Sequence, residues 1–287
     1  MLLVIDVGNT NTALGVFEGK QLQAHWRLTT NREQTADEYG ILIRNLFSLE
    51  GIEPSRIDGI MIASVVPPLN ALLEEMAKKY FKLDALFLEP GTRTGMSIHY
   101  DNPSEVGADR IANAVAAFEK YGGPCVIVDF GTAITFDAIS EKGEYLGGII
   151  SPGLGIAAEA LFARAARLPR VDIREPERVI GTNTVASMQS GLFYGAVGLV
   201  DGILDRLMGV LGPGTRVVAT GGQAPLIASA SKYKLPVDSW LTLDGLRIIY
   251  ERNQTPAASS GKESPSRDAA RGSRLPARAP APAAVKR

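Results

Sequence analysis

Cysteine, histidine and long apolar runs are scarce in this sequence. The chain of 287 residues holds one cysteine, Cys125, and two histidines, His25 and His99. One cysteine excludes an intramolecular disulfide, and the two histidines form no Cys/His metal pattern. No apolar stretch reaches the roughly 18 residues that a membrane span requires, and the N-terminus has no basic region or cleavage site. We therefore expect a cytoplasmic protein without a membrane partner.

A strong net charge is also missing. The formal net charge is -1, with 45% hydrophobic and 21% charged residues, which is typical of a soluble globular protein long enough for two domains. We find no helix-turn-helix or aromatic-basic pattern and expect no specific nucleic-acid partner. From about Asn253 the composition changes to Ala, Pro, Ser and Arg. Such a segment buries too little apolar surface to fold alone, so residues 253–287 are expected to be a disordered, basic tail.

The first eleven residues carry the first chemical signal. They read MLLVIDVGNTN, an apolar run that meets Asp6, then Gly8 and three polar residues. This pattern predicts a buried strand, a tight turn and a second strand at 13–17. Glycine lets the backbone approach a phosphate, and Asn and Thr add donors. A carboxylate beside such a turn repels phosphate, so we expect Asp6 to hold hydrated Mg²⁺; an ordinary Asn-rich hairpin turn is the alternative.

The same pattern returns in the second half of the chain. Residues 126–135 read VIVDFGTAIT, with Asp129, Gly131 and Thr132 in the places of the first Asp, Gly and Asn. Each copy is followed by an apolar strand and a turn. Two such turns at the head of similar strand orders predict a duplicated domain, with two carboxylate loops facing a cleft.

The first half is predicted to have the order βββαβαβ, with a Thr35 and Glu38 capping box at its first helix. Residues 89–104 then form a long connection without apolar periodicity, of a kind that is often functional. It leads into a helix whose first turn holds Asp109 and Arg110. Either an acidic residue favoured by the helix dipole lies beside a solvated arginine, or the aspartate is a base and the arginine orients an anionic group.

The second half repeats the strand order, followed by two helices and a strand at 216–220. The longer helix begins near Thr184, which we interpret as its cap. Its four glycines between residues 191 and 202 permit close helix contact, which suits a dimer interface and intramolecular packing equally. The strand at 216–220 ends in Gly221-Gly222, a turn that could lie beneath an adenosine.

Four motifs, in this order, resemble the motif set of type III pantothenate kinases. They are Asp6-Val7-Gly8-Asn9-Thr10, Gly107-Ala108-Asp109-Arg110, Asp129-Phe130-Gly131-Thr132-Ala133, and Gly147-Gly148 with Pro152-Gly153. The resemblance covers about residues 1–252. It implies an α/β protein with duplicated actin-like (ribonuclease H-like) βββαβαβα domains and ATP in the interdomain cleft. The domains would be residues 1–118 and 119–252.

The resemblance also implies a role for each motif. Asp109 would be the catalytic base. ATP would contact Asp6, Val7, Gly8, Asn9, Thr10, Asn11, Thr12, Ala13 and Thr132. Pantothenate would contact Tyr100, Gly107, Ala108, Asp109, Arg110 and Thr184, the last from the partner subunit of a homodimer. Asp129 would bind the monovalent cation, K⁺ or NH₄⁺, and Asp6 would lie near Mg²⁺ through water.

These residues predict transfer of the γ-phosphate of ATP to pantothenate, giving 4′-phosphopantothenate, the first step of coenzyme A biosynthesis. Another small-molecule kinase of the same fold is one alternative, because the fold alone does not choose the acceptor. A nucleotide-sensing regulator or chaperone-like ATPase is the other. Tyr100, Asp109 and Arg110 discriminate between them, since a sensor needs the two phosphate turns but no base on the acceptor side.

Overall fold

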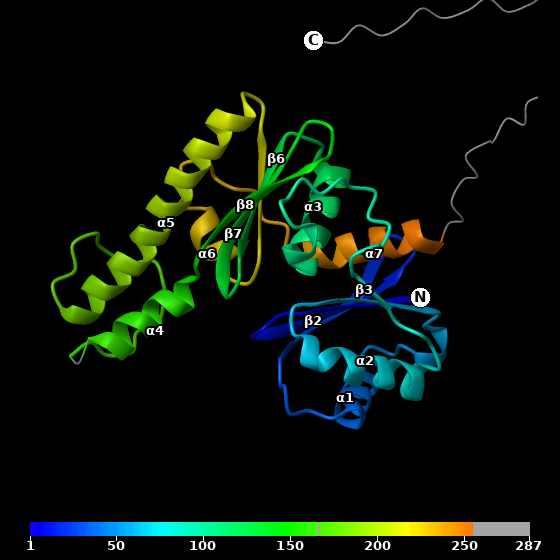
Figure 1. The fold of residues 1–287 in the computed structure, drawn as a ribbon. Helices are drawn as coiled ribbons and strands as arrows, with labels where there is room; N and C mark the ends of the chain where they lie inside the picture. The colour runs from blue at the N-terminus through cyan, green and yellow to red at the C-terminus, as the bar shows by residue number, and fades with distance from the viewer. Residues whose placement is uncertain (166, 255–287) are drawn as a thin grey trace, which may run out of the picture. The chain divides into compact units, whose positions relative to one another are not determined.

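The computed structural model describes residues 1–165 and 167–254. The tail expected at 253–287 therefore lies outside the described residues from position 255 onward. Within the described part, the chain forms two mixed β-sheets with helices packed against them (Figure 1). No helix of the described residues is both long and apolar enough to cross a membrane.

The first sheet has five strands in the order β3-β2-β1-β4-β5. The strands are β1 (Leu2–Val7), β2 (Asn11–Glu18), β3 (Gln21–Thr29), β4 (Gly59–Ser64) and β5 (Leu86–Phe87). β1, β2 and β3 pair antiparallel, whereas β4 runs parallel to both β1 and β5. The central strand β1 therefore ends at its Asp6 turn beside the parallel end of β4, where a ligand can approach several strand ends at once.

Two helices, α1 (Ala36–Leu49) and α2 (Asn70–Met76), cover one face of this sheet. The predicted capping box is confirmed: Glu38 N donates to Thr35 Oγ1, and Thr35 N donates to Glu38 Oε2 at 2.7 Å. Apolar residues spaced three and four apart, including Tyr39 and Ile43, are buried against the sheet. This side of the sheet is therefore a packed core that a ligand does not enter.

The second sheet repeats the arrangement with the order β8-β7-β6-β9. Its strands are β6 (Cys125–Phe130), β7 (Ala133–Ile139), β8 (Tyr145–Pro152) and β9 (Arg216–Thr220). β6 pairs antiparallel with β7 and parallel with β9, as β1 does with β2 and β4. Val237 adds an isolated parallel bridge to Ala219 at the sheet edge, where β5 lies in the first sheet. The predicted duplication and the actin-like α/β fold are thus confirmed.

The helices that pack on the second sheet are α5 (Thr184–Leu211) and α6 (Ala224–Ala228), with α4 (Leu154–Arg164) following β8. One sequence prediction at α5 is wrong. Its cap is Asn183, whose Oδ1 accepts from Ala186 N at 2.9 Å, whereas Thr184 is the first helical residue. Asn183 has the extended backbone that a cap requires, and its amide oxygen satisfies the N–H of the third helical residue.

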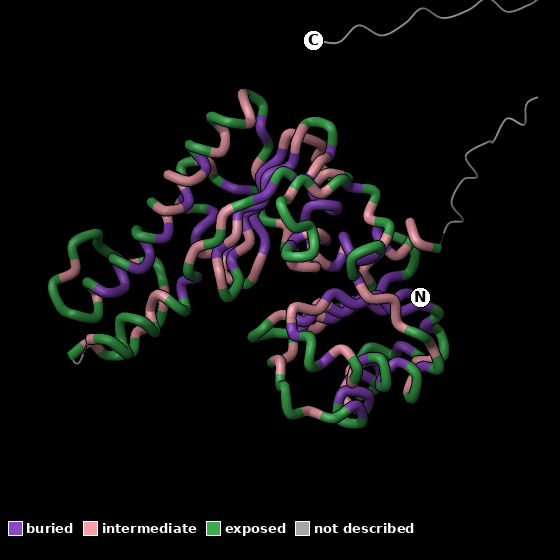
Figure 2. Tube along the Cα trace, in the orientation of Figure 1, coloured by how far each residue is buried: buried purple, intermediate pink, exposed green. Residues whose placement is uncertain are grey.

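Two further helices, α3 (Ala108–Tyr121) and α7 (Leu241–Gln254), lie against each other and share one core with both sheets. Val4 of β1 and Ile127 of β6 both belong to this core. Figure 1 shows α3 and α7 side by side, and Figure 2 shows buried segments in this part of the chain. The C-terminal helix of the described chain therefore packs beneath the N-terminal sheet. A division of the duplicated domains after residue 118 stays a prediction, because this shared core crosses it.

Candidate active site

The turn after β1 and the turn after β6 line one cleft of about 300 Å³. In each turn a glycine N–H, that of Gly8 or Gly131, donates to a carbonyl of its own turn at 3.0 Å. The two turns touch, because the Oγ1 atoms of Thr10 and Thr132 lie 3.0 Å apart. Two similar sequence motifs, distant along the chain, therefore form the two sides of a single site.

Most of the residues predicted to contact ATP line this cleft: Asp6, Gly8, Asn9, Thr10, Asn11, Ala13 and Thr132. Gly221 and Gly222, which follow β9, line it as well. Val7 and Thr12 do not. Val7 is fully buried in the apolar core, and Thr12 is buried with its Oγ1 2.9 Å from Thr30 Oγ1. Their side chains support the turn from beneath rather than reaching the cleft.

Three carboxylates, Asp6, Asp109 and Asp129, share the cleft. Burial, followed by the charges of the other two aspartates, raises the pKa of Asp6 well above its usual range. Burial also raises the pKa of Asp109. For Asp129, burial and the neighbouring carboxylates raise the pKa to about 7. Without a bound cation, three carboxylates so close together repel one another. Such a cluster suits a site that receives cations with its substrate.

The carboxylate of Asp129 is held from behind by Asn113 of α3. Asn113 is fully buried, donates from Nδ2 to Asp129 Oδ2 at 3.0 Å and accepts from Thr242 Oγ1 at 2.7 Å. Among the described residues no group of three or more His, Cys, Asp or Glu side chains could hold a metal ion. Mg²⁺ in nucleotide sites needs only one or two carboxylates, with phosphate oxygens and water completing its shell. Asp6 and Asp129 therefore fit cations that arrive with a nucleotide.

The first turn of α3 carries Asp109 and Arg110 into the same cleft. Arg110 N donates to Asp109 Oδ1 at 2.8 Å, which orients that carboxylate. Arg110 is not a solvated arginine, because its side chain is buried and its Nε donates to Asp137 Oδ1 at 2.8 Å. Tyr145 OH donates to the same oxygen at 2.7 Å. The alternative of an exposed arginine beside a dipole-stabilised acid is therefore wrong for Arg110.

Tyr100 lies beside this arginine network. Its ring centroid is 6.4 Å from that of Tyr145, and a Cβ on Gly147 would lie 3.7 Å from the Tyr100 ring. A Cβ on Gly148 would come within 2.5 Å of Arg110 Nη2. Gly148 is thus required for the close packing of β8 against Arg110, whereas Gly147 is required by its φ of +117°. Gly107 and Ala108, at the start of α3, do not line the carboxylate cleft but a neighbouring cavity, together with Val106 and Ile111.

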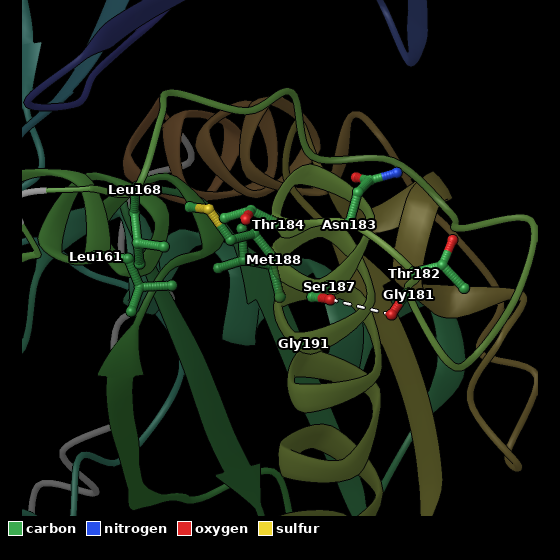
Figure 3. Close-up of a pocket in the computed structure, with 10 residues that line it drawn as sticks. Leu161, Leu168, Gly181, Thr182, Asn183, Thr184, Ser187, Met188 and Gly191 are labelled. Carbon is green, nitrogen blue, oxygen red and sulfur yellow. Dashed lines mark hydrogen bonds between the residues drawn. The ribbon is translucent and has the colours of Figure 1, made fainter.

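Thr184 lies elsewhere. It lines a separate pocket at the N-terminus of α5, together with Leu161 and Met188 (Figure 3). There Ser187 Oγ donates to the carbonyl of Gly181 at 3.3 Å. This pocket and the carboxylate cleft have no lining residue in common. One copy of the chain therefore does not bring Thr184 to Asp109.

The residues of the cleft and its support that the sequence did not reveal include Arg27, Asn113, Asp137 and Trp240. His25 of β3 packs on Trp240, with the two ring centroids 3.8 Å apart and the ring planes tilted by 35°. Asp137 had a signal that was available, since it is a charged residue within the apolar strand ITFDAI. A buried charge of this kind needs a partner.

Comparison with known proteins gives a consistent family. A sequence profile described as type III pantothenate kinase matches residues 2–206. The type III pantothenate kinase of Koribacter versatilis (strain Ellin345) is 62% identical over 265 residues, which are 89% of this chain and 97% of that protein. The type III pantothenate kinase of Solibacter usitatus (strain Ellin6076) is 57% identical over 260 residues, covering 91% and 100%.

Solved structures share the fold at low sequence identity. The activator of the 2-hydroxyisocaproyl-CoA dehydratase from Clostridium difficile, solved with bound ADPNP, aligns with a TM-score of 0.51 and 12% identity, covering 90% of this chain and 99% of that one. The ethanolamine utilization protein EutJ from Carboxydothermus hydrogenoformans aligns with a TM-score of 0.52 and 14% identity, covering 86% and 89%. At such identities the likeness concerns the fold alone.

Proposed function

The chain belongs to the type III pantothenate kinase family, and from that premise we propose how its residues perform the reaction. The enzyme transfers the γ-phosphate of ATP to pantothenate, in the first step of coenzyme A biosynthesis. Phosphoryl transfer depends on positioning and charge neutralisation more than on covalent catalysis. The observation that carries the proposal is one cleft holding both glycine turns together with Asp109 and Arg110.

Asp109 is the general base that accepts the proton from the terminal hydroxyl of pantothenate. Its raised pKa, caused by burial, supports this role because a base works best when its pKa approaches the working pH. The hydrogen bond from Arg110 N to Oδ1 keeps the carboxylate in one orientation. A base of this kind contributes about 10²- to 10⁴-fold to the rate.

Pantothenate lies against Tyr100 and residues 107–110. The Arg110 guanidinium attracts the pantothenate carboxylate, while Asp137 and Tyr145 keep that guanidinium in place. A fixed arginine loses less side-chain entropy on binding than a free one. Arg110 therefore provides the specificity for an acidic acceptor, and Asp109, the preceding residue, accepts the proton.

ATP lies between the duplicated domains, residues 1–118 and 119–252, with its phosphates against residues 6–13 and Thr132. Asp6 would hold Mg²⁺ through water, and Asp129 would hold the monovalent cation, K⁺ or NH₄⁺. When bound, these cations supply positive charge to the phosphate oxygens. The support is chemical: each carboxylate has a raised pKa from burial beside like charges, so each is stabilised by a cation.

We further propose a homodimer in which Thr184 completes the acceptor site of the partner subunit. Thr184 is remote from Asp109 within one chain. Apolar side chains are exposed on α4 and α5, the two helices that contribute residues to its pocket: Ile156, Leu161, Phe162, Val185 and Tyr194. An exposed apolar group of this kind favours association. We place the enzyme in the cytoplasm, where its donor ATP is available.

The test is ADP release from purified protein with Mg-ATP, with and without pantothenate, and with K⁺ replaced by Na⁺ in parallel. We expect turnover that requires both pantothenate and K⁺, with 4′-phosphopantothenate identified by mass spectrometry. ADP release that ignores pantothenate would favour the sensor or chaperone-like alternative. Turnover with another alcohol alone would favour a different small-molecule kinase.

A further inference from the structure

We propose that Arg27 binds the triphosphate of ATP. The bound triphosphate then connects the two walls of the cleft, which are the turn after β1 and the Gly221-Gly222 turn after β9. Arg27 lies on β3, in register with Ala13 of the first phosphate turn. Its sequence neighbours Trp26 and Leu28 point to the opposite face, where they pack in the core beneath α1 and α2. Strand alternation therefore directs Arg27 to the cleft face. The inference rests on the phosphate-transfer function proposed above.

Arg27 is the unpaired positive charge of the cleft. Arg27 and Arg110 are the two basic residues that line it among the described residues, and Arg110 is already engaged by Asp137. In the part of the chain that the structure describes, no hydrogen bond or ion pair joins the exposed Arg27 side chain to another residue. Its guanidinium charge nevertheless lowers the pKa values of Asp6 and Asp129 against the effect of burial, so it lies near both.

The guanidinium also reaches the other wall of the cleft. A Cβ built on Gly222, in the turn after β9, would lie 2.6 Å from Arg27 Nη1. The absence of a side chain at Gly222 thus leaves the space that the arginine occupies. Arginine binds phosphate oxygens through two parallel N–H donors, and an unpaired arginine beside two phosphate turns is suited to that contact. In a cleft with three carboxylates, the positive charge of Arg27 attracts the polyanionic triphosphate.

The first experiment compares Arg27→Ala and Arg27→Lys with the wild-type enzyme in steady-state kinetics. We expect Arg27→Ala to raise KM for ATP by about 10- to 100-fold, as for a lost charge-assisted hydrogen bond, and to leave KM for pantothenate nearly unchanged. Arg27→Lys should recover part of the loss. Inhibition by ADP should weaken, whereas inhibition by adenosine should not. Arg44→Ala, at an exposed arginine of α1 on the far face of the sheet, is the matched control.

The second experiment tests the bridge between the walls. Gly222→Ala should raise KM for ATP, because the methyl group displaces a flexible side chain rather than backbone. In the Arg27→Ala background the same substitution should add nothing. A double-mutant cycle measures this coupling. Additive effects would contradict a bridge that depends on Gly222.

The outcomes separate this inference from the function on which it rests. A wild-type enzyme that phosphorylates pantothenate, with an Arg27→Ala variant of normal KM for ATP, overturns the role of Arg27 alone. A variant that loses thermal stability but keeps its KM for ATP shows that Arg27 serves only as a counter-charge, which also overturns it. If the wild type does not phosphorylate pantothenate, the proposed function fails. The affinities of the wild type and of Arg27→Ala for a non-hydrolysable ATP analogue are then compared. Weaker binding by the variant supports the role of Arg27, and equal binding overturns it.

Discussion

Asp137 of β7 holds Arg110 of α3 in a buried ion pair, with 2.7 Å between Asp137 Oδ1 and Arg110 Nη2. Both side chains are almost fully removed from solvent. The pair fixes the guanidinium that is proposed to bind the carboxylate of pantothenate. It also links the helix carrying Asp109 to the second sheet, so the base and the acceptor site depend on the same contact.

Asp137→Asn should therefore impair pantothenate binding and lower stability. Breaking a buried pair leaves an uncompensated charge and typically costs about 3–5 kcal/mol. We expect KM for pantothenate to rise about tenfold or more, with a smaller change in KM for ATP, and a lower midpoint of thermal unfolding. Tyr145→Phe is the matched variant, since it removes one hydrogen bond to Asp137 and leaves the charges in place. Equal effects on both KM values would argue against a role specific to the acceptor.

The pKa of Asp129 predicts how stability depends on pH in the ligand-free enzyme. Burial and like charges raise this pKa from about 3.8 to about 7. A raised pKa means that the folded state binds the proton more tightly. The stabilisation is full below about pH 3.8 and is lost as the pH rises through about 7.

Asp129→Asn removes that dependence. Its thermal midpoint should exceed that of the wild type at pH 8, by several degrees if the difference reaches 1–2 kcal/mol, and the advantage should shrink towards pH 5. Differential scanning calorimetry of the ligand-free proteins measures it, with Asp172→Asn as an exposed control. A difference that stays constant with pH would contradict the assigned cause.

Mixed subunits test the proposed contribution of Thr184. Asp109→Asn and Thr184→Val should each impair the homodimer. In a mixed dimer, the site with the intact Asp109 receives the intact Thr184 only if that residue comes from the partner. Mixing should therefore restore activity. Activity that stays at the sum of the two variants would indicate that Thr184 acts within its own chain or not at all.

The fold was readable from sequence where the signals are local. Alternating and helical apolar patterns, with the Thr35 and Glu38 capping box, predicted the strands and helices of both halves. The repeated Asp-x-Gly turns predicted the duplication. Local signals also misled, because Asn183 and Thr184 are both good caps and only the backbone geometry distinguishes them.

Long-range partners could not be read in this way. Arg110 and Asp137 meet because α3 packs beside β7, and no periodicity reports that packing. Arg27 carried no distinctive signal in the sequence, because a polar residue between two apolar ones is expected in any strand with one exposed face. Its role becomes visible only when the Gly222 turn, far away in sequence, is seen beside it.

The most direct measurement of the whole account is the turnover of Asp109→Asn. The asparagine side chain has nearly the same shape and can still accept from Arg110 N, so both substrates should bind with KM values close to those of the wild type. We predict that kcat falls by about 10²- to 10⁴-fold, because no base remains at the acceptor hydroxyl. A kcat close to that of the wild type would contradict the assignment of Asp109 as the base.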